Sequence, residues 1–198
     1  MHPALPLFVL VRHGETAWTL TGQRTGLTDI ELTEAGAASA KALATLLRGF
    51  SFARVWTSPL KRACQTAELS GFGAVAELAP DLCEWHYGDY EGRTTASIRA
   101  DRPDWRLFEH GCPNGETPEA IGVRADRVIA EIHKVHAASG NVLVFAHSDV
   151  LRVVIARWLK LPALEGRRVK LDTSSISILG YDHDLTEPVI RRLNQVAG

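Results

Sequence analysis

Two uninterrupted runs of apolar residues are the clearest pattern in this sequence. The runs LFVLV at 7–11 and VLVFA at 142–146 contain no polar residue, which is typical of strands buried on both faces of a sheet. Shorter apolar segments predict strands at 53–57 and 75–78, and two or three more strands are expected within 168–193.

Apolar residues recur at helical spacing between these strands. Thr33 is expected to cap a helix that runs to about Arg48, and Pro59 is expected at the first position of a helix that ends near Leu69. Thr117 precedes a long helix, whose apolar positions are three or four residues apart: Ile121, Ala125, Val128, Ile129, Ile132 and Val135.

A further helix is expected over about 150–159, so strands and helices alternate along the chain. This alternation predicts a three-layer α/β/α fold with a mainly parallel central sheet, in which ligands bind beyond the carboxyl ends of the strands. The loop at 14–29 and the stretch at 81–116 follow neither pattern, and we expect the second to be an irregular lid or insertion. No repeat or linker divides the chain, so residues 1–198 are expected to form one domain.

Composition changes this picture little. The net charge of −1 gives no support for a nucleic-acid or membrane surface, and no segment has the length of a transmembrane helix. The apolar run at 7–11 lacks a preceding basic region, so a signal peptide is not expected. Cys64, Cys83 and Cys112 lack metal-type spacing and are interpreted as small, partly buried apolar residues of a cytoplasmic protein.

Each of the two apolar strands is followed by a histidine. His13 comes after the strand at 7–11, within Arg12-His13-Gly14, and His147 comes after the strand at 142–146. If these strands are parallel neighbours, both imidazoles emerge at one edge of the sheet. One such histidine is most often structural or a surface residue, whereas two at matching strand ends favour a functional site.

Three arginines accompany the histidines. Arg12 adjoins His13, Arg62 lies in the first turn of the helix after TSPLKR, and Arg152 lies one turn into the helix after His147. A single exposed arginine on a helix is usually a solvated surface residue. Together, however, the three suggest guanidinium groups arranged around a phosphate dianion.

Phosphoryl transfer needs a nucleophile and a proton for the leaving oxygen. A neutral imidazole is such a nucleophile and needs no metal or other cofactor, provided that its second nitrogen donates a hydrogen bond; we expect a backbone carbonyl of the 14–16 loop to accept it. Glu84, beside Trp85 and Tyr87, would have a raised pKa in a partly enclosed pocket and could donate the proton. Taken alone, Glu84 is more simply interpreted as a surface carboxylate.

Several segments together resemble one known family. VRHGETAW, TGLTD, TSPLKRACQTAE, EWHYGDYEG, PNGET and VLVFAHSDVLR are similar to motifs of the histidine phosphatase superfamily, in its phosphoglycerate-mutase-like branch, over about residues 7–193. The segments GQRTGLTD, DLCEWHYGDYEG, GCPNGETPEAIG and GYDHDLTEPV are most similar to sedoheptulose-1,7-bisphosphatases and related bacterial phosphatases. The resemblance implies a phosphoglycerate-mutase-like fold and a metal-independent phosphatase for small phosphorylated metabolites, with sugar phosphates and bisphosphates as the first choice.

The resemblance also implies a role for each matching residue. His13 would be the phosphorylated nucleophile, and Glu84 would protonate the leaving group and then activate water. The rest of the phosphate pocket would be formed by Arg12, Arg62 and His147. The remainder of the substrate would be held by Arg24, Thr25, Tyr87, Arg152 and His183.

Three positions depart from the family's pattern. Ser148 and Asp149 stand where many relatives carry two glycines, and a carboxylate near a phosphate repels it unless it points away. We expect Asp149 to cap the following helix, with contact to a sugar hydroxyl as the alternative. Thr19 stands where mutases carry an asparagine, and it can still donate a hydrogen bond to phosphate.

The middle of the chain bears on the choice between phosphatase and mutase. Mutases of this fold carry a lysine and paired arginines there, whereas the segment 92–117 has no Arg-Arg pair. We therefore expect a pocket poor in basic residues that passes the phosphoryl group to water. A phosphoglycerate mutase, a broad-specificity acid phosphatase and a non-catalytic phospho-ligand or protein-binding module are the alternatives. The oligomeric state is left open, with the homodimer as the commonest assembly.

Two further groups of residues invite a functional interpretation. His133 and His136 could share a metal, but no third ligand accompanies them, so they are interpreted as a solvated helix face and no metal site is expected. Trp85, Trp105 and Phe108 are interpreted as packing the irregular stretch onto the core rather than stacking on a ligand.

Overall fold

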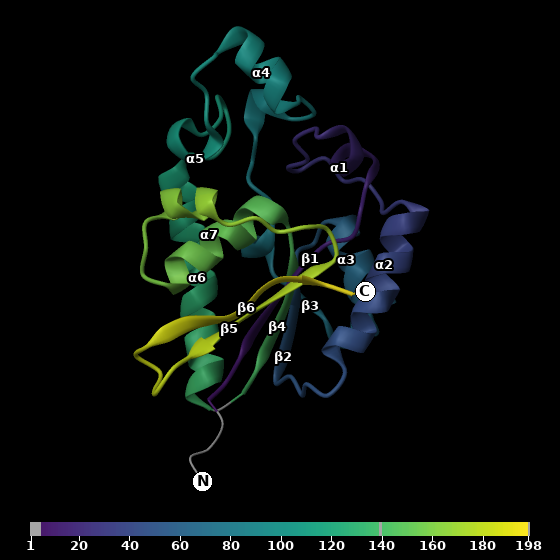
Figure 1. Cartoon of the computed structure of the whole chain (residues 1–198), viewed down its shortest axis with the longest axis vertical. Coiled ribbons are helices and arrows are strands. Elements are labelled where there is room, and N and C mark those ends of the chain that lie inside the picture. The colour runs from purple at the N-terminus through teal and green to yellow at the C-terminus, as the bar shows by residue number, and fades with distance from the viewer. Residues whose placement is uncertain (1–4, 139, 198) are drawn as a thin grey trace.

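Six strands form one sheet in the computed structural model, which describes residues 5–138 and 140–197 (Figure 1). Their order across the sheet is β3-β2-β4-β1-β5-β6. The first four run parallel to one another, whereas β5 is antiparallel to β1 and to β6. The expected mainly parallel sheet is therefore confirmed. The strands are β1 (Phe8–Arg12), β2 (Arg54–Thr57), β3 (Glu77–Leu78), β4 (Val142–Ala146), β5 (Ser175–Tyr181) and β6 (Pro188–Val196).

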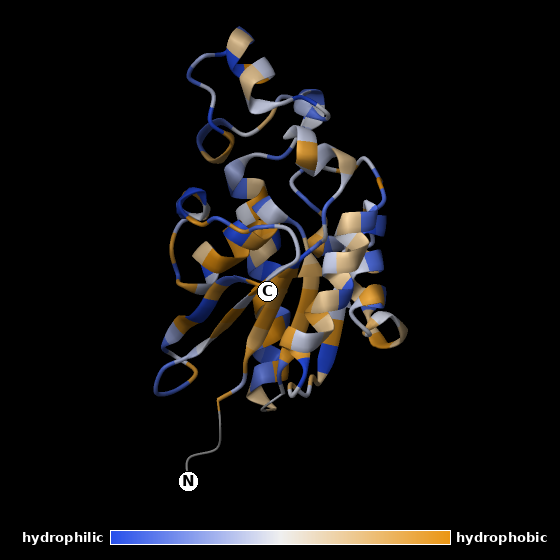
Figure 2. Ribbon diagram, turned by 45° about the vertical axis from the view of Figure 1, so that its right-hand side comes forward, coloured by the Kyte–Doolittle hydropathy of each residue, from blue (hydrophilic) through white to orange (hydrophobic). Residues whose placement is uncertain are grey.

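Helices cover both faces of this sheet (Figure 1). One face carries α2 (Glu34–Leu47) and α3 (Lys61–Leu69), and the other carries α6 (Pro118–Ala137) and α7 (Ser148–Trp158). Successive side chains of β1 point to opposite faces, so Phe8 and Leu10 pack into the cluster of α6 and α7, while Val9 and Val11 pack into that of α2. A strand between two helical layers has no solvated face, which explains its unbroken apolar run and the hydrophobic centre of the sheet in Figure 2.

The irregular stretch at 81–116 contains short helices and lies beyond the carboxyl ends of the parallel strands (Figure 1). The Trp85 and Phe108 rings pack with centroids 5.3 Å apart, and Trp105 and Tyr90 pack at 5.2 Å. All four side chains are buried, so the interpretation of the aromatics as packing residues is confirmed. The short helices in and just before the stretch are η2 (Pro80–Leu82), η3 (Gly88–Tyr90), α4 (Thr95–Asp101) and α5 (Leu107–His110).

Some element boundaries differ from the predictions. Leu60 is the N-terminal cap of α3, so Pro59 lies outside that helix. The strand expected at 75–78 is divided between the 3-10 helix η1 (Gly73–Val75) and the two residues of β3. The 14–29 loop contains a short helix, α1 (Ala17–Thr21), whose capping box uses Thr19. The Thr19 hydroxyl donates to the Thr16 carbonyl at 2.8 Å within this loop, and its hydrogen bond to phosphate stays a prediction.

The loop that follows His13 rests directly on the first turn of α2. A Cβ atom on Gly14 would lie 2.6 Å from the carbonyl oxygen of Gly36, and a Cβ atom on Gly36 would lie 2.2 Å from that of Glu15. The Thr33 hydroxyl donates to the Glu15 carboxylate at 2.7 Å. Only glycine permits this approach, which fixes the loop beside His13.

Cys64, Cys83 and Cys112 are free thiols, and Cys112 is buried, which agrees with their interpretation as packing residues. Among the described helices, none combines the length and the apolar character that a membrane span requires.

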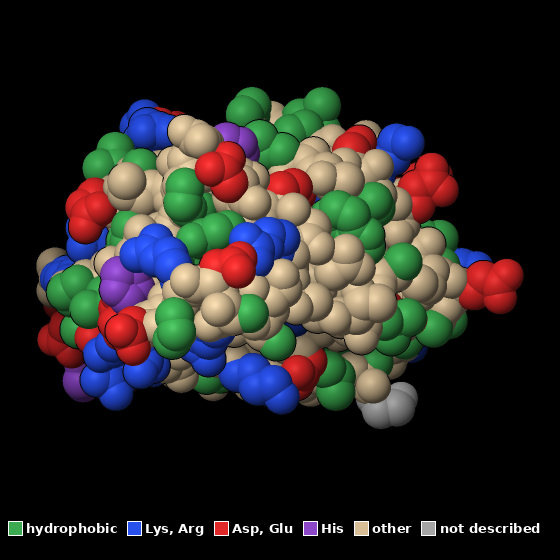
Figure 3. Space-filling model, turned by 90° about the horizontal axis from the view of Figure 1, so that it is seen from above, with side chains coloured by type: hydrophobic (Ala, Val, Ile, Leu, Met, Phe, Trp, Pro, Cys, Tyr) green, Lys and Arg blue, Asp and Glu red, His purple; other side chains and the backbone are tan. Residues whose placement is uncertain are grey.

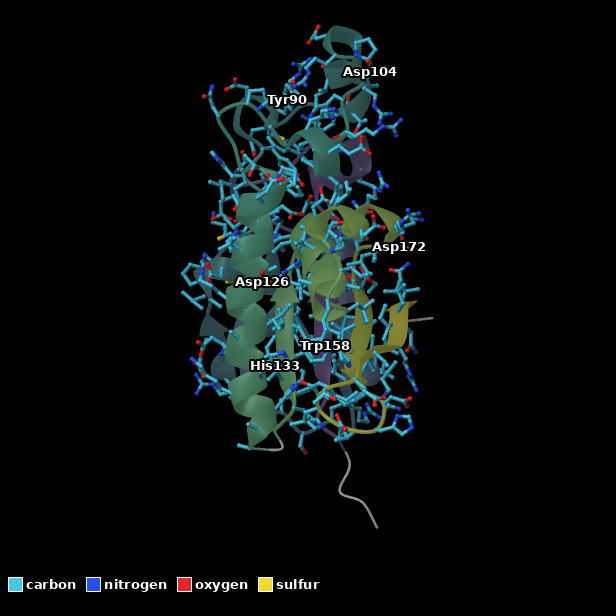
Figure 4. The ribbon with its side chains drawn as sticks, turned by 90° about the vertical axis from the view of Figure 1, so that its left-hand side faces the viewer. Tyr90, Asp104, Asp126, His133, Trp158 and Asp172 are labelled. Atoms are coloured by element: carbon cyan, nitrogen blue, oxygen red, sulfur yellow. The ribbon has the colours of Figure 1, made fainter. Side chains whose placement is uncertain are left out.

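The expectation that His133 and His136 lie on a solvated face holds for His133, which is exposed, but is wrong for His136. His136 is 1% exposed, and the Nδ1 atoms of His136 and His133 lie 2.9 and 3.1 Å from the Tyr181 hydroxyl. His133 stacks on Trp158, with ring centroids 5.4 Å apart, and the two residues lie close together in Figure 4. The histidines therefore pack α6 against β5 and α7.

Acid is expected to weaken this packing. Burial lowers the pKa of His136 to about 4, so the folded protein excludes a proton that the unfolded chain binds below about pH 6.5. The unfolding free energy should therefore fall as the pH drops from about 6.5 towards 4. The stability that the neutral His136 contributes should be fully present above that range. Urea titrations at several pH values should show a shallower slope for His136→Gln than for the exposed-residue control His110→Gln. Equal slopes in the two variants would contradict the lowered pKa of His136.

Candidate active site

His13 and His147 follow neighbouring parallel strands. The register pairs Arg12 with Ala146, and the backbone N–H of His13 donates to the Ala146 carbonyl at 2.9 Å. The centroids of the two imidazole rings lie 5.1 Å apart. The prediction that both rings emerge at one edge of the sheet is confirmed.

His13 is a neutral imidazole with a defined tautomer. Its side chain is buried, and Nδ1 lies 2.7 Å from the carbonyl oxygen of Gly14. Because a carbonyl only accepts hydrogen bonds, Nδ1 carries the hydrogen and Nε2 keeps its lone pair. Burial, reinforced by the charges of Arg12 and Arg62, lowers the pKa of His13 well below its ordinary value. The carbonyl acceptor expected in the 14–16 loop is therefore that of Gly14.

Arg12 extends from the end of β1 to the wall of a cavity beside His13. Its Nη1 donates to the Leu171 carbonyl at 2.5 Å. Its Nε is buried and has no protein partner in the described part of the chain. An unpaired, charged donor beside a nucleophile is a favourable partner for an anion.

Arg62 and His147 form the buried layer behind this wall. Nε of Arg62 donates to Nδ1 of His147 at 3.0 Å, so Nε2 of His147 carries the hydrogen, which it donates to Ser58 Oγ at 2.7 Å. Both side chains are fully buried, and most of their polar atoms are engaged by the protein. Direct contact of either residue with phosphate stays a prediction. The other guanidinium nitrogens of Arg62 donate to the carbonyls of Thr25, Gly26 and Thr28.

Glu84 enters the same cavity from the irregular stretch. One carboxylate oxygen accepts from the backbone N–H groups of Trp85 at 2.8 Å and Val150 at 2.9 Å, and the other accepts from that of Asp149 at 3.0 Å. The side chain is 4% exposed, so its interpretation as a surface carboxylate is wrong. Burial, and secondly the charge of Asp149, raise the pKa of Glu84, although the three N–H groups oppose the shift.

Sequence reasoning missed Arg124, which holds the Glu84 loop. This buried residue of α6 donates to the carbonyl of Glu84 at 3.3 Å and to that of Asp81 at 2.8 Å, and it pairs with Glu116 at 2.7 Å. Arg124 lies on the apolar stripe of α6, next to Ala125. A charged residue on a buried helix face was the signal that could have identified it.

The prediction that Asp149 caps α7 is wrong. His147 occupies the cap, and the Asp149 carboxylate enters a buried network. It accepts from Arg152 Nη1 at 2.6 Å, from Arg24 Nη1 at 3.1 Å and from the Tyr87 hydroxyl at 2.8 Å. Burial alone would raise the pKa of Asp149, but Arg152 and Arg24 outweigh it and lower the pKa. Contact between Asp149 and a sugar hydroxyl stays a prediction.

Replacing Asp149 by alanine is expected to lower the unfolding free energy by about 3 kcal/mol, because it leaves two arginines and a buried hydroxyl without their partner. Asp126→Ala is the matched control, since it removes a more exposed Asp–Arg pair with Arg157, which should cost less than about 1 kcal/mol. Urea unfolding measures both. Equal losses in the two variants would show that the Asp149 network is no stronger than a surface pair.

Four of the five residues expected to hold the rest of the substrate line the cavity in front of His13. This cavity, which we call the catalytic cavity, has a volume of about 250 Å³. Its walls also include Trp18, Gln23, Thr95 and Ser148, which the sequence did not single out as ligand contacts. The four expected residues are Arg24, Thr25, Tyr87 and Arg152.

The structure does not bring His183 to this edge of the sheet. β5 runs antiparallel to β1 and pairs Leu179 with Phe8, so the turn that follows β5 lies beyond the start of β1, opposite His13. His183 is exposed there and contacts Glu187 at 2.8 Å and Asp182 at 3.3 Å. These three exposed side chains form the one group with metal-type spacing in the described residues. Substrate contact by His183 at the catalytic cavity is inconsistent with this placement.

The expectation of few basic residues around the site is also wrong. Arg99 of α4 and Arg106 line a second cavity with Arg167 of the 3-10 helix η4 (Ala163–Arg168). Lys and Arg side chains gather on one half of this end of the molecule (Figure 3). These arginines come from separate segments, and Arg167 belongs to the pair Arg167-Arg168, which lies outside 92–117. A lack of basic residues therefore does not disfavour a mutase.

Comparison with known proteins places the chain among phosphatases. Residues 8–195 match the histidine phosphatase superfamily (branch 1). An acid phosphatase of Mycobacterium tuberculosis is 41% identical over 181 residues, which cover 90% of this chain and 88% of that protein. A sedoheptulose 1,7-bisphosphatase of Saccharomyces cerevisiae is 35% identical over 218 residues, covering 94% of this chain and 78% of that protein.

Solved structures show the same fold. The product of an open reading frame of Mycobacterium tuberculosis superposes with a TM-score of 0.92 at 39% identity, covering 98% of this chain and 99% of that one. A structure described as a putative alpha-ribazole-5'-P phosphatase of Escherichia coli superposes with a TM-score of 0.84 at 30% identity, covering 98% and 99% of the two chains. The fold predicted from the sequence is therefore confirmed.

Proposed function

This chain belongs to the histidine phosphatase superfamily and is a hydrolase of that family, and from this premise we propose that it dephosphorylates small metabolites through a phosphohistidine on His13. One observation carries the proposal. The neutral His13, whose Nε2 keeps its lone pair, lines one cavity together with Arg12 and Glu84. Nucleophile, anion partner and proton donor therefore meet in one place, as phosphoryl transfer requires.

In the first step, the lone pair on Nε2 of His13 forms the N–P bond while the bond from phosphorus to the leaving oxygen breaks. Glu84 gives its proton to that oxygen, and the alcohol departs. The raised pKa of Glu84 favours the protonated form that this step needs. Arg12 stabilises the charge on the phosphoryl oxygens.

In the second step, the Glu84 carboxylate takes a proton from water as the water oxygen attacks phosphorus. The N–P bond breaks, its electron pair returns to His13, and inorganic phosphate leaves. Glu84 is protonated again, so the cycle closes without another reactant. Arg62 and His147 are hydrogen-bonded to each other behind the catalytic cavity, and they hold the cavity wall beside His13 in place.

We propose sugar phosphates as the substrate class. The catalytic cavity is lined by Thr25, Gln23, Tyr87 and Thr95, side chains that exchange hydrogen bonds with hydroxyl groups. The similarity to a sedoheptulose 1,7-bisphosphatase supports this choice. Broad acid phosphatase activity is the second candidate, supported by the similarity to an acid phosphatase.

Release of inorganic phosphate from a panel of phosphorylated sugars, nucleotides and p-nitrophenyl phosphate tests both candidates. With a chelator present throughout, we expect kcat/KM for at least one sugar phosphate to exceed that for p-nitrophenyl phosphate. Similar values across the panel would favour the broad acid phosphatase. Isomerisation of phosphoglycerate without release of phosphate would overturn the proposal in favour of a mutase.

A further inference from the structure

The two oxygens of the Glu84 carboxyl group have different surroundings. Oε1 accepts two hydrogen bonds, from the backbone N–H groups of Trp85 at 2.8 Å and Val150 at 2.9 Å. Within the described residues 5–138 and 140–197, Oε2 accepts one, from the backbone N–H of Asp149 at 3.0 Å. A carboxyl oxygen has two lone pairs, so both are engaged on Oε1 and one stays free on Oε2. When Glu84 is protonated, its hydrogen therefore lies on Oε2.

The N-terminus of α7 faces Glu84 and favours its ionised form. The N–H groups of Asp149 and Val150 belong to the first turn of α7, where backbone N–H groups have no partner within the helix. They bind the Glu84 carboxyl group instead, and the positive end of a helix stabilises a negative charge. Without a compensating charge, Glu84 would more readily lose the proton that the first step of the reaction needs.

The Asp149 carboxylate is a negative charge in that same turn, and it is held in the ionised form. Oδ1 accepts from Arg152 Nη1 at 2.6 Å, and Oδ2 accepts from Arg24 Nη1 at 3.1 Å and from the Tyr87 hydroxyl at 2.8 Å. Two of these three donors are positively charged, whereas Glu84 accepts from neutral backbone N–H groups. A single proton shared between the two buried carboxyl groups therefore goes to Glu84.

Arginines on neighbouring elements act in the opposite direction. Arg12, at the end of β1, and Arg62 of α3 both interact with the charge of Glu84, and their own charges favour its carboxylate form. Arg124 of α6 meets the backbone carbonyl of Glu84 at 3.3 Å, and its charge is compensated by Glu116 at 2.7 Å. A negative charge on the other side is therefore needed to retain the proton.

The other ionisable groups around Glu84 carry no charge. Burial lowers the pKa of His13 and of His147 well below its ordinary value, so both imidazoles are neutral. Burial raises the pKa of Tyr87 well above its ordinary value, so this hydroxyl is neutral as well. Among the described residues that line the catalytic cavity, Asp149 is then the one anionic side chain that faces Glu84. Burial and, secondly, this charge raise the pKa of Glu84.

We propose that Asp149 is a positioning residue of the reaction, whose carboxylate keeps the catalytic proton on Oε2 of Glu84. This inference rests on the proposed phosphatase function, and Asp149 acts through Glu84 rather than on phosphorus. In the first step, the proton passes from Oε2 to the leaving oxygen while the N–P bond to His13 forms and the P–O bond breaks. In the second step, Oε2 takes a proton from water while the water oxygen attacks phosphorus and the N–P bond breaks. The charge of Asp149 makes Oε2 a better base for this step.

Asp149→Asn tests the proposal, because asparagine has the shape of aspartate and still accepts hydrogen bonds through its amide oxygen but carries no charge. Its kcat/KM for a sugar phosphate should begin to fall at a lower pH than that of the unmodified protein. On the alkaline side, we expect kcat/KM to be about ten-fold lower than in the unmodified protein. At acidic pH, where Glu84 is protonated in both proteins, it should not be lower. The substrate ionises identically in both assays, so the ratio of the two profiles isolates the protein.

Two comparisons separate this role from a merely structural one. The leaving group of p-nitrophenyl phosphate needs no proton, so Asp149→Asn should lower kcat/KM for this ester less than about two-fold at any pH. Asp126→Asn removes a carboxylate of α6 that pairs with Arg157 and does not line the catalytic cavity, and it should leave both pH profiles unchanged. An equal loss on both esters in Asp149→Asn, or an alkaline fall at an unchanged pH, would overturn the proposal.

A titration of the unmodified protein locates the proton without any variant. The side-chain carboxyl carbons of Glu84 and Asp149 are followed by NMR from acidic to alkaline pH, with Glu119, an exposed glutamate of α6, as the reference. We expect Glu84 to lose its proton at a higher pH than Glu119, while Asp149 stays ionised. The opposite order, or a Glu84 that titrates like Glu119, would overturn the proposal even if Asp149→Asn does not fold. If no phosphate ester is hydrolysed, the proposed function fails, but this titration still decides which carboxyl group holds the proton.

Discussion

Replacing His13 by alanine is expected to lower kcat by about 10⁴-fold or more on every phosphate ester that the protein hydrolyses. Alanine removes the nitrogen that forms the bond to phosphorus, and nothing else in the catalytic cavity replaces it as a neutral nucleophile with a defined lone pair. Arg12 and Glu84 remain in the variant. The residual rate should therefore reflect substrate binding and charge stabilisation alone. A continuous assay of phosphate release measures this rate.

Two controls make the His13 result specific. The melting temperature of His13→Ala should stay close to that of the unmodified protein, which shows that the lost rate is not lost folding. His183→Ala replaces an exposed histidine at the opposite end of the sheet and should leave kcat unchanged. A His13→Ala protein that is folded and retains most of its activity would rule out the phosphohistidine mechanism.

Replacing Glu84 by glutamine should lower kcat/KM for sugar phosphates by about 10²–10⁴-fold, because glutamine cannot give a proton to the departing alkoxide. The loss of kcat/KM, which reports the steps up to phosphorylation of His13 and not the later attack of water, should be much smaller for p-nitrophenyl phosphate, since p-nitrophenolate leaves without needing a proton. The ratio of the two losses therefore isolates the role of Glu84 as an acid. Glu119→Gln, an exposed glutamate at the start of α6, is the matched control.

The Glu84→Gln variant should also change how kcat/KM for a sugar phosphate depends on pH. Burial raises the pKa of Glu84, so its acid form persists to a higher pH than that of an ordinary glutamate and is lost as the pH rises through the raised pKa. The kcat/KM for a sugar phosphate should therefore fall on the alkaline side of that pKa in the unmodified protein. This fall should be absent in Glu84→Gln. If the variant loses the same factor in kcat/KM on both esters and keeps the alkaline fall, another group is the proton donor.

Local patterns explain why part of this site could be predicted from the sequence. Strands β1 and β4 are buried on both faces, so their apolar runs are unbroken, and each run ends at a histidine. Parallel neighbours end at one edge, which was enough to bring His13 and His147 together. The Gly14 carbonyl that fixes the His13 tautomer was also foreseeable, because it belongs to the adjacent residue.

Contacts between distant segments explain why the rest could not be predicted. Arg24 and Asp149 are 125 residues apart, and nothing near Asp149 distinguishes its buried ion pairs from an ordinary helix cap. Arg99 and Arg167 reach one cavity from different segments, so a search for paired arginines within 92–117 does not show that they converge. His183 was misplaced because the direction of one strand, β5, decides at which end of the sheet its turn lies.

The phosphohistidine itself is the most direct test of this account. The protein is mixed with a substrate and quenched within the first turnovers under conditions that preserve an acid-labile N–P bond, and its peptides are analysed by mass spectrometry. We expect one added phosphoryl group on the peptide that contains His13, absent from His13→Ala and longer-lived in Glu84→Gln, where activation of water is impaired. Rapid turnover with no phosphoryl group on His13, or with the group on another residue, would contradict it.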